Sequence, residues 1–194
     1  MHQTEQKRYS KTTALVLCGI FAALMAICSF ITIPLGFTPI PINLATLGVF
    51  LTGGILGKKY GSISLIVYIL LGAVGVPVFA GFKGGLGVLA GPTGGYIIGY
   101  LAAAFLTGLL VELVFTKTGT DSGQRSAKSS TSRFIGIILA MIAGLAACYA
   151  LGTAWFMIST GTGLGAALIS CVIPFLPGDA AKIIVGALLV QKLR

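Results

Sequence analysis

The strongest constraint on this chain of 194 residues is the absence of charge from a long early stretch. No Asp, Glu, Lys or Arg occurs between Lys11 and Lys58. A transmembrane helix needs about 20 predominantly apolar residues, so this stretch has room for two. Only 9% of the chain is charged, and 56% is hydrophobic, whereas a soluble domain carries about 25% charged residues. The sequence therefore predicts an integral membrane protein embedded in the lipid bilayer.

Apolar segments alternate with short Pro/Gly-rich or basic connections along the rest of the chain. This pattern predicts an all-α membrane protein, a single domain over residues 1–194 with six transmembrane helices. The predicted helices span residues 12–33, 43–56, 62–76, 96–115, 134–158 and 164–193, the last with a break at 174–178. Prolines end the first helix because they cannot continue it. A polar linker is predicted over 116–133.

Basic residues mark one side of this predicted zigzag. They are Lys7, Arg8, Lys11, Lys58, Lys59, Lys117, Arg125, Lys128, Arg133, Lys192 and Arg194. Of the connections on the other side, only the one with Lys83 carries a charge. The positive-inside rule then places both termini in the cytoplasm. The net charge of +9 is thus a sign of topology, and no nucleic acid partner is expected.

Metal and histidine chemistry are not expected. Four cysteines lie in apolar runs without CxxC spacing: Cys18, Cys28, Cys148 and Cys171. They are interpreted as small packing residues. His2, the only histidine, belongs to the polar N-terminal segment. We therefore predict no metal site, no cofactor and no histidine-based catalysis.

Small residues recur four apart on the first predicted helix, at Ala14, Cys18, Ala22 and Ala26. Such stripes let helix backbones approach closely in lipid. The pattern alone does not decide whether the stripe packs inside the protein or faces a partner.

An acid and a base interrupt the last apolar segment. Asp179 follows Pro177-Gly178, and Lys182 lies one helical turn later on the same face. Charged residues at membrane depth indicate a functional site. One interpretation is a polar ligand site between helices, and the other is an ion pair that only holds the helix break together.

A glycine-rich loop between the third and fourth predicted helices, residues 77–95, is apolar apart from Lys83. Non-helical backbone at membrane depth is tolerated where it is buried or lines a cavity. We therefore expect a re-entrant-like outer loop, in which the backbone of Thr93, Gly94 and Gly95 approaches a ligand, rather than a plain connector. About 22 Å of helix separates Asp179 from Leu193. With Leu193 at the inner surface of a membrane about 30 Å thick, Asp179 is expected near the same outer face.

Three motifs resemble one known family. They are Gly72-Ala-Val-Gly-Val-Pro-Val-Phe-Ala-Gly81, Leu89-Ala-Gly-Pro-Thr-Gly-Gly-Tyr96 and Pro177-Gly-Asp-x-x-Lys182. They are similar to those of the BioY family, the biotin-type substrate-binding subunits of energy-coupling-factor transporters. The resemblance runs from the first helix to the C-terminus.

The resemblance implies a six-helix bundle in a prokaryotic cell membrane with an outward-facing biotin site. It implies docking on a transmembrane coupling subunit and two cytoplasmic ATPase subunits. It also implies that the small-residue stripe of the first helix faces the coupling subunit. One departure is Ala45, where many members have Gln, although Asn43 lies two residues earlier.

Biotin suits the candidate residues chemically. Asp179 is expected to accept the ureido N–H groups, and Lys182 or Lys83 to bind the carboxylate tail. The apolar parts are expected to contact aromatic side chains, namely Phe79, Tyr96, Tyr149 and Trp155.

Two other functions are possible for a chain with these residues. An enzyme would use Asp179 and Lys182 as an acid–base pair, but no further polar group accompanies them on the helices. A stand-alone secondary transporter or channel for a small polar or anionic solute is the stronger alternative, because broken helices also mark transporter sites.

Overall fold

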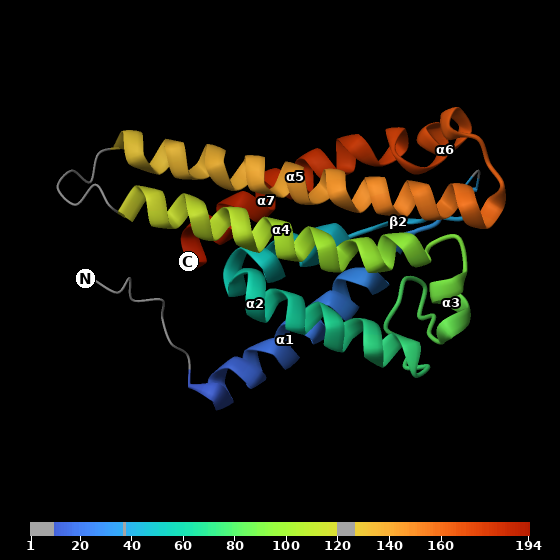
Figure 1. Ribbon diagram of the computed structural model, residues 1–194, viewed down its shortest axis with the longest axis horizontal. Helices are drawn as coiled ribbons and strands as arrows, with labels where there is room; N and C mark the ends of the chain where they lie inside the picture. The colour runs from blue at the N-terminus through green and yellow to red at the C-terminus, as the bar shows by residue number, and fades with distance from the viewer. Residues whose placement is uncertain (1–9, 37, 120–126) are drawn as a thin grey trace.

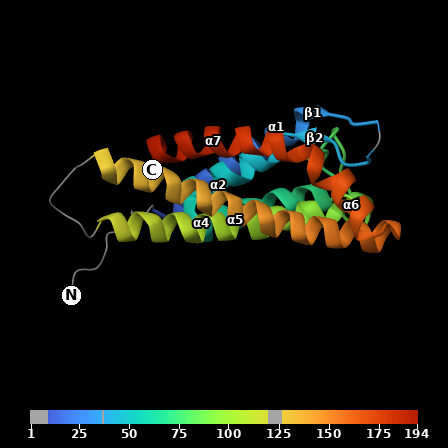
Figure 2. The same ribbon diagram turned by 90° about the horizontal axis from the view of Figure 1, so that it is seen from above.

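The computed structural model describes residues 10–36, 38–119 and 127–194. These residues form an elongated helical bundle (Figure 1). Within the described ranges, five segments are long and apolar enough to cross a membrane: α1 (Lys11–Phe30), α2 (Ala45–Ala73), α4 (Gly94–Gly119), α5 (Ala127–Thr160) and the run from α6 to α7. α4 and α5 lie side by side along one face, and α7 lies on the other (Figure 2).

Short elements gather at one end of the bundle (Figure 1). β1 (Thr32–Ile33) pairs antiparallel with β2 (Ile42–Asn43). α3 (Leu86–Ala90) interrupts the loop before α4. α6 (Leu164–Cys171) and a 3-10 turn, η1 (Ile173–Phe175), lead into α7 (Leu176–Leu193).

α2 contains two of the six predicted helices. Gly57 has φ 77°, a left-handed conformation that favours glycine, and the helix bends there. The arms, residues 45–56 and 58–73, meet at an angle, and the second arm returns toward the end from which the first arm starts (Figure 1). The predicted fold of six membrane-spanning helices is therefore confirmed.

Glu112 of α4 stabilises this bend. The backbone N–H of Lys58, the first residue after Gly57, donates to Glu112 Oε1 at 3.1 Å. The bend leaves that N–H without a regular helical partner, and the carboxylate replaces it. The Lys58 ammonium lies 3.9 Å from Glu112 Oε2, and its side chain is 45% exposed.

The small-residue stripe of α1 packs inside the protein. Ala14, Cys18, Ala22 and Ala26 are all buried, and the Cys18 thiol donates to the Tyr60 carbonyl of α2 at 3.5 Å. The stripe therefore does not face a partner subunit, contrary to what the resemblance implied. Its small side chains instead let α1 approach α2 closely.

The side of α1 that points away from the bundle, its outer face, carries larger side chains. Leu15, Val16, Ile20 and Ile27 are all exposed. Ala23 and Gly19 lie between them and are also exposed. This outer face is available to lipid or to another helix.

The two ends of the bundle differ in charge. The start of α1, the bend of α2, the start of α5 and the end of α7 lie at one end (Figure 1). The described basic residues there include Lys11, Lys58, Lys59, Arg133, Lys192 and Arg194. Of the predicted linker over 116–133, residues 116–119 and 127–133 belong to α4 and α5. Residues 120–126, like Lys7 and Arg8, lie outside the described residues.

We predict that Glu112→Ala destabilises the protein more than Lys58→Ala. Glu112→Ala leaves the Lys58 N–H without an acceptor, which costs about 1–3 kcal/mol. Lys58→Ala keeps that N–H bonded and removes only a part-exposed ion pair, which costs about 0–1 kcal/mol. Thermal unfolding in detergent measures both. Equal unfolding midpoints would show that the Lys58 N–H has another partner at the bend.

Candidate ligand-binding cavity

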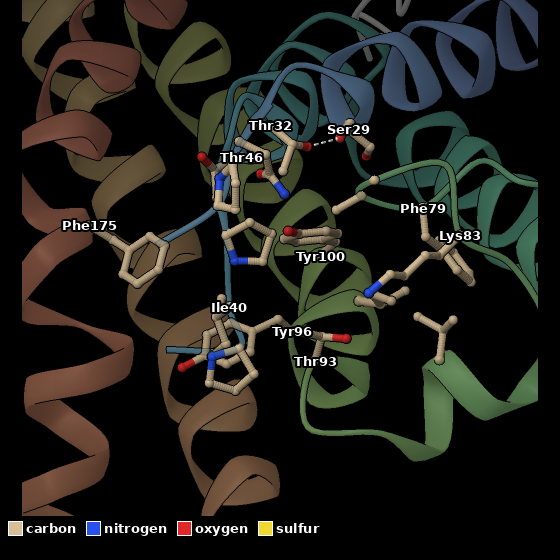
Figure 3. A pocket seen from close by; sticks show the side chains of 18 of the residues that line it. Ser29, Thr32, Ile40, Thr46, Phe79, Lys83, Thr93, Tyr96, Tyr100 and Phe175 are labelled. Atoms are coloured by element: carbon tan, nitrogen blue, oxygen red, sulfur yellow. Dashed lines mark hydrogen bonds between the residues drawn. The ribbon is translucent and has the colours of Figure 1, made fainter. Parts of the chain in front are cut away.

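A cavity of about 440 Å³ opens at the end of the bundle that carries the short elements. Most of its lining comes from α1, the segment 34–43, α2, the segment 79–83, α4, α5 and α7 (Figure 3), and β1, α3, α6 and η1 each add one residue. Segments far apart in the sequence thus meet around one space. Its volume suits a small organic molecule.

A cluster of four polar side chains forms one wall. Asp179 Oδ1 accepts hydrogen bonds from Lys182 Nζ at 2.8 Å and from the Thr46 hydroxyl at 2.8 Å. The Lys182 ammonium also donates to Thr46 Oγ1 at 3.1 Å. The Tyr149 hydroxyl donates to Asp179 Oδ2 at 2.5 Å. The cluster joins α2, α5 and α7.

Asp179 and Lys182 are buried, at 2% and 8% exposure. A buried ion pair is stable only when its remaining hydrogen-bonding groups are satisfied. A carboxylate has about four lone-pair positions, and three donors reach Asp179. About one acceptor position on Asp179 and one N–H of Lys182 therefore stay available to a ligand.

The helix break places Asp179 in the first turn of α7. Pro177 suits that turn because it lacks an N–H that would need a partner. The dipole at a helix N-terminus stabilises the carboxylate. The break lies between Cys171 and Leu176, so Pro177 and Gly178, predicted to belong to it, are already helical.

Aromatic side chains make the rest of the cavity largely apolar. Phe79 is 1% exposed and meets the Tyr68 ring edge-on, with 5.5 Å between ring centroids. The Tyr68 hydroxyl shares a 2.8 Å hydrogen bond with Ser29. Tyr96 and Tyr100, four residues apart on α4, line the same space (Figure 3). The Tyr96 hydroxyl lies 3.0 Å from Thr153 Oγ1.

Lys83 lies at the exposed rim of the cavity, and its side chain points into the cavity (Figure 3). The preceding residue, Phe82, has φ 57° and stacks on Phe30 with 4.3 Å between ring centroids. This stack connects the segment 79–83 to the end of α1. It thereby helps to place Lys83.

Most of the predicted ligand-binding residues line this cavity. They are Asn43, Phe79, Lys83, Thr93, Tyr96, Tyr149, Asp179 and Lys182. Asn43 also caps the start of α2, because its Oδ1 accepts from the Ala45 N–H at 3.0 Å.

Three predicted ligand contacts lie elsewhere. Gly94, Gly95 and Trp155 are not part of the cavity lining. The indole N–H of Trp155 donates to the Gly91 carbonyl at 3.0 Å, and Gly95 packs against the Trp155 side chain. Gly94 packs on the backbone of Leu89. These residues hold the glycine-rich segment against α5, so they shape the loop rather than the ligand contact.

Other lining residues were not predicted from the sequence. They include Ser29, Thr46, Tyr68, Tyr100 and Phe175. Two carried a usable signal, because Tyr100 shares a helix face with Tyr96 and Thr46 follows Asn43 by three residues. Tyr68 carried none, since its approach to the cavity depends on the bend of α2.

Inside a helical membrane protein, an aromatic cavity with a buried polar cluster suits the binding of a small organic solute. The BioY family model matches residues 2–194. The chain therefore belongs to the BioY family.

Relatives match over most of their length. The chain is 39% identical to "Biotin transporter BioY" of Thermotoga maritima, covering 93% of this chain and 95% of that protein. It is 37% identical to "Biotin transporter BioY" of Rhizobium etli, covering 92% and 91%. A crystal structure of "the S-component for biotin from an ECF-type ABC transporter" matches with a TM-score of 0.78 and 32% identity, covering 100% of this chain and 95% of that one.

We predict that Lys182→Met destabilises the empty protein more than the double variant Asp179→Asn/Lys182→Met. Removing Lys182 alone leaves a buried carboxylate without its counter-charge, which costs about 3–5 kcal/mol. The double variant removes both charges. Its amide oxygen accepts from one of the two hydroxyls, Thr46 or Tyr149, and its NH₂ group donates to the other. Thermal unfolding without ligand compares them. If Lys182→Met unfolds at the wild-type temperature, the pair is not desolvated as the structure indicates.

Proposed function

We propose that this chain captures biotin at the outer face of a prokaryotic cell membrane, as the binding subunit of an energy-coupling-factor transporter. The observation that carries the proposal is the buried polar cluster at one wall of an aromatic cavity. The relatives named as biotin transporters, and the solved biotin S-component, supply the ligand's identity.

The cluster complements the ureido ring of biotin. The ring presents N–H donors beside one carbonyl acceptor. Asp179 offers an acceptor position and Lys182 a donor, separated by only 2.8 Å. Because Asp179 has about one free acceptor position, it binds one ureido N–H directly, and not both as expected from the sequence alone. The carbonyl binds the Lys182 ammonium.

The remaining cavity suits the rest of the ligand. The thiophane ring and the aliphatic chain lie along the aromatic side chains of Phe79, Tyr96 and Tyr100. The carboxylate lies near Lys83 at the rim. Polar contacts thus orient the molecule, and apolar contacts supply most of the buried area.

Orientation in the membrane follows from the two ends of the bundle. The end with the described basic residues lies in the cytoplasm, as the positive-inside rule requires. Both termini are then cytoplasmic, and the cavity opens to the outside. This orientation suits capture of a vitamin before uptake.

Uptake then depends on partner subunits. The sequence contains no nucleotide-binding motif. A transmembrane coupling subunit and two cytoplasmic ATPase subunits supply the energy. The coupling subunit docks on the outer face of α1, where Gly19 has nothing within 4 Å of an added Cβ and Ala23 is exposed. Small residues there let a second helix approach.

We predict that Asp179→Asn weakens biotin binding by at least tenfold. A hydrogen bond to a charged group contributes about 1.5–3 kcal/mol, and the amide has a weaker acceptor. Titration of the purified protein with labelled biotin measures this. Lys192→Gln, at the opposite end of the bundle, is the matched control and retains wild-type affinity.

Thermal unfolding without ligand is compared first, since Asp179→Asn also removes the counter-charge of Lys182. Wild-type affinity in a well-folded Asp179→Asn would show that the cluster stabilises the fold and does not bind the ligand. Absence of biotin binding by the wild-type protein would refute the proposed function itself.

We predict that Ala23→Trp and Ala22→Trp differ in effect, although the residues are adjacent. Ala23→Trp enlarges the outer face of α1, so it blocks co-purification with the coupling and ATPase subunits and leaves biotin binding intact. Ala22→Trp inserts a large ring where α1 meets α2, so it lowers the unfolding temperature. If Ala23→Trp still co-purifies and supports uptake, docking occurs on another surface.

A further inference from the structure

Three charged side chains line the cavity: Asp179, Lys182 and Lys83. Asp179 and Lys182 neutralise each other across a 2.8 Å salt bridge. Among the described residues, Lys83 forms no salt bridge. The cavity thus has one uncompensated positive charge, that of Lys83.

The two ends of the cavity differ in burial. The polar cluster is closed off, since Asp179 and Lys182 are 2% and 8% exposed. Lys83 is exposed, and so are other lining residues that surround the opening: Pro34, Pro39, Gly81 and Phe82. In Figure 3, Lys83 and Phe175, one turn before Asp179, lie on opposite sides of the cavity.

This difference in burial between the two ends of the cavity decides which part of a bound ligand is exposed to solvent. A ligand whose ring is bound at the closed cluster has its carboxylate at the exposed rim. A group attached through that carboxyl extends past Lys83 into solvent, so it meets no packed core.

Resting on the proposed biotin function, we propose that this protein also binds biotin whose carboxyl group is joined to an amine. Such ligands are biotin amides, including the conjugate of biotin with the side chain of lysine. The buried cluster binds the ring of either form. Lys83 sets the preference for the free acid through its charge.

The size of that preference follows from the exposure of Lys83. Solvent screens an exposed ion pair, so losing the ligand's negative charge weakens binding by no more than about fivefold. An ion pair in an enclosed pocket has a far larger effect, because the unpaired ammonium stays desolvated. The ratio of the two affinities therefore reports where the carboxylate lies.

The test is competition against labelled biotin on the purified full-length chain in detergent. The probes are biotin, its primary amide and biotinyl-lysine. Both conjugates are expected to bind within about fivefold of biotin. In Lys83→Met, the affinity for biotin falls to that for the amide. Lys83→Arg keeps the charge and preserves the preference of the wild type.

The results that would overturn this inference differ from the result that would overturn the proposed function. If biotin binds and either conjugate binds more than about fivefold weaker, the cavity encloses the carboxylate and the inference is overturned. If Lys83→Met weakens biotin and its amide by the same factor, Lys83 does not bind the carboxylate, and its role is overturned. If biotin itself does not bind, the proposed function fails, and the inference fails with it.

Discussion

The pairing of Asp179 with Lys182 is the interaction on which the cavity end of this protein depends. Either charge alone inside a membrane protein costs several kcal/mol. The structure meets this cost with hydrogen bonds from Thr46 on α2 and Tyr149 on α5. The pair therefore connects three helices at the cavity wall. It still leaves one acceptor and one donor position, so the same groups can stabilise the empty protein and recognise a ligand.

A second constraint acts at the opposite end. The bend at Gly57 reverses the direction of α2, so the first arm begins near the cavity and the second arm ends near it. Thr46 on the first arm and Tyr68 on the second arm consequently line the same space. Glu112 supplies the acceptor that the bend requires at Lys58. The ligand site thus depends on a carboxylate at the far end of the bundle.

Much of this arrangement was predictable from the sequence, because charge is rare in it. The uncharged stretch after Lys11 indicated membrane helices, and the isolated Asp179 and Lys182 indicated a site. Contacts between helices were not predictable. The small-residue stripe that includes Ala22 indicated that the first helix packs closely against another helix, but it did not indicate which one. Trp155 was assigned to the ligand from its aromatic character, whereas its indole N–H binds the Gly91 carbonyl.

The central claim is that the buried cluster recognises the polar ring of biotin. An experimental structure of the purified protein with biotin bound tests it most directly. We expect a ureido N–H within hydrogen-bonding distance of Asp179, the ureido carbonyl at Lys182 and the carboxylate at the Lys83 rim. A ureido ring at the rim, with the carboxylate on Lys182, would show that the buried cluster recognises the acid and not the ring.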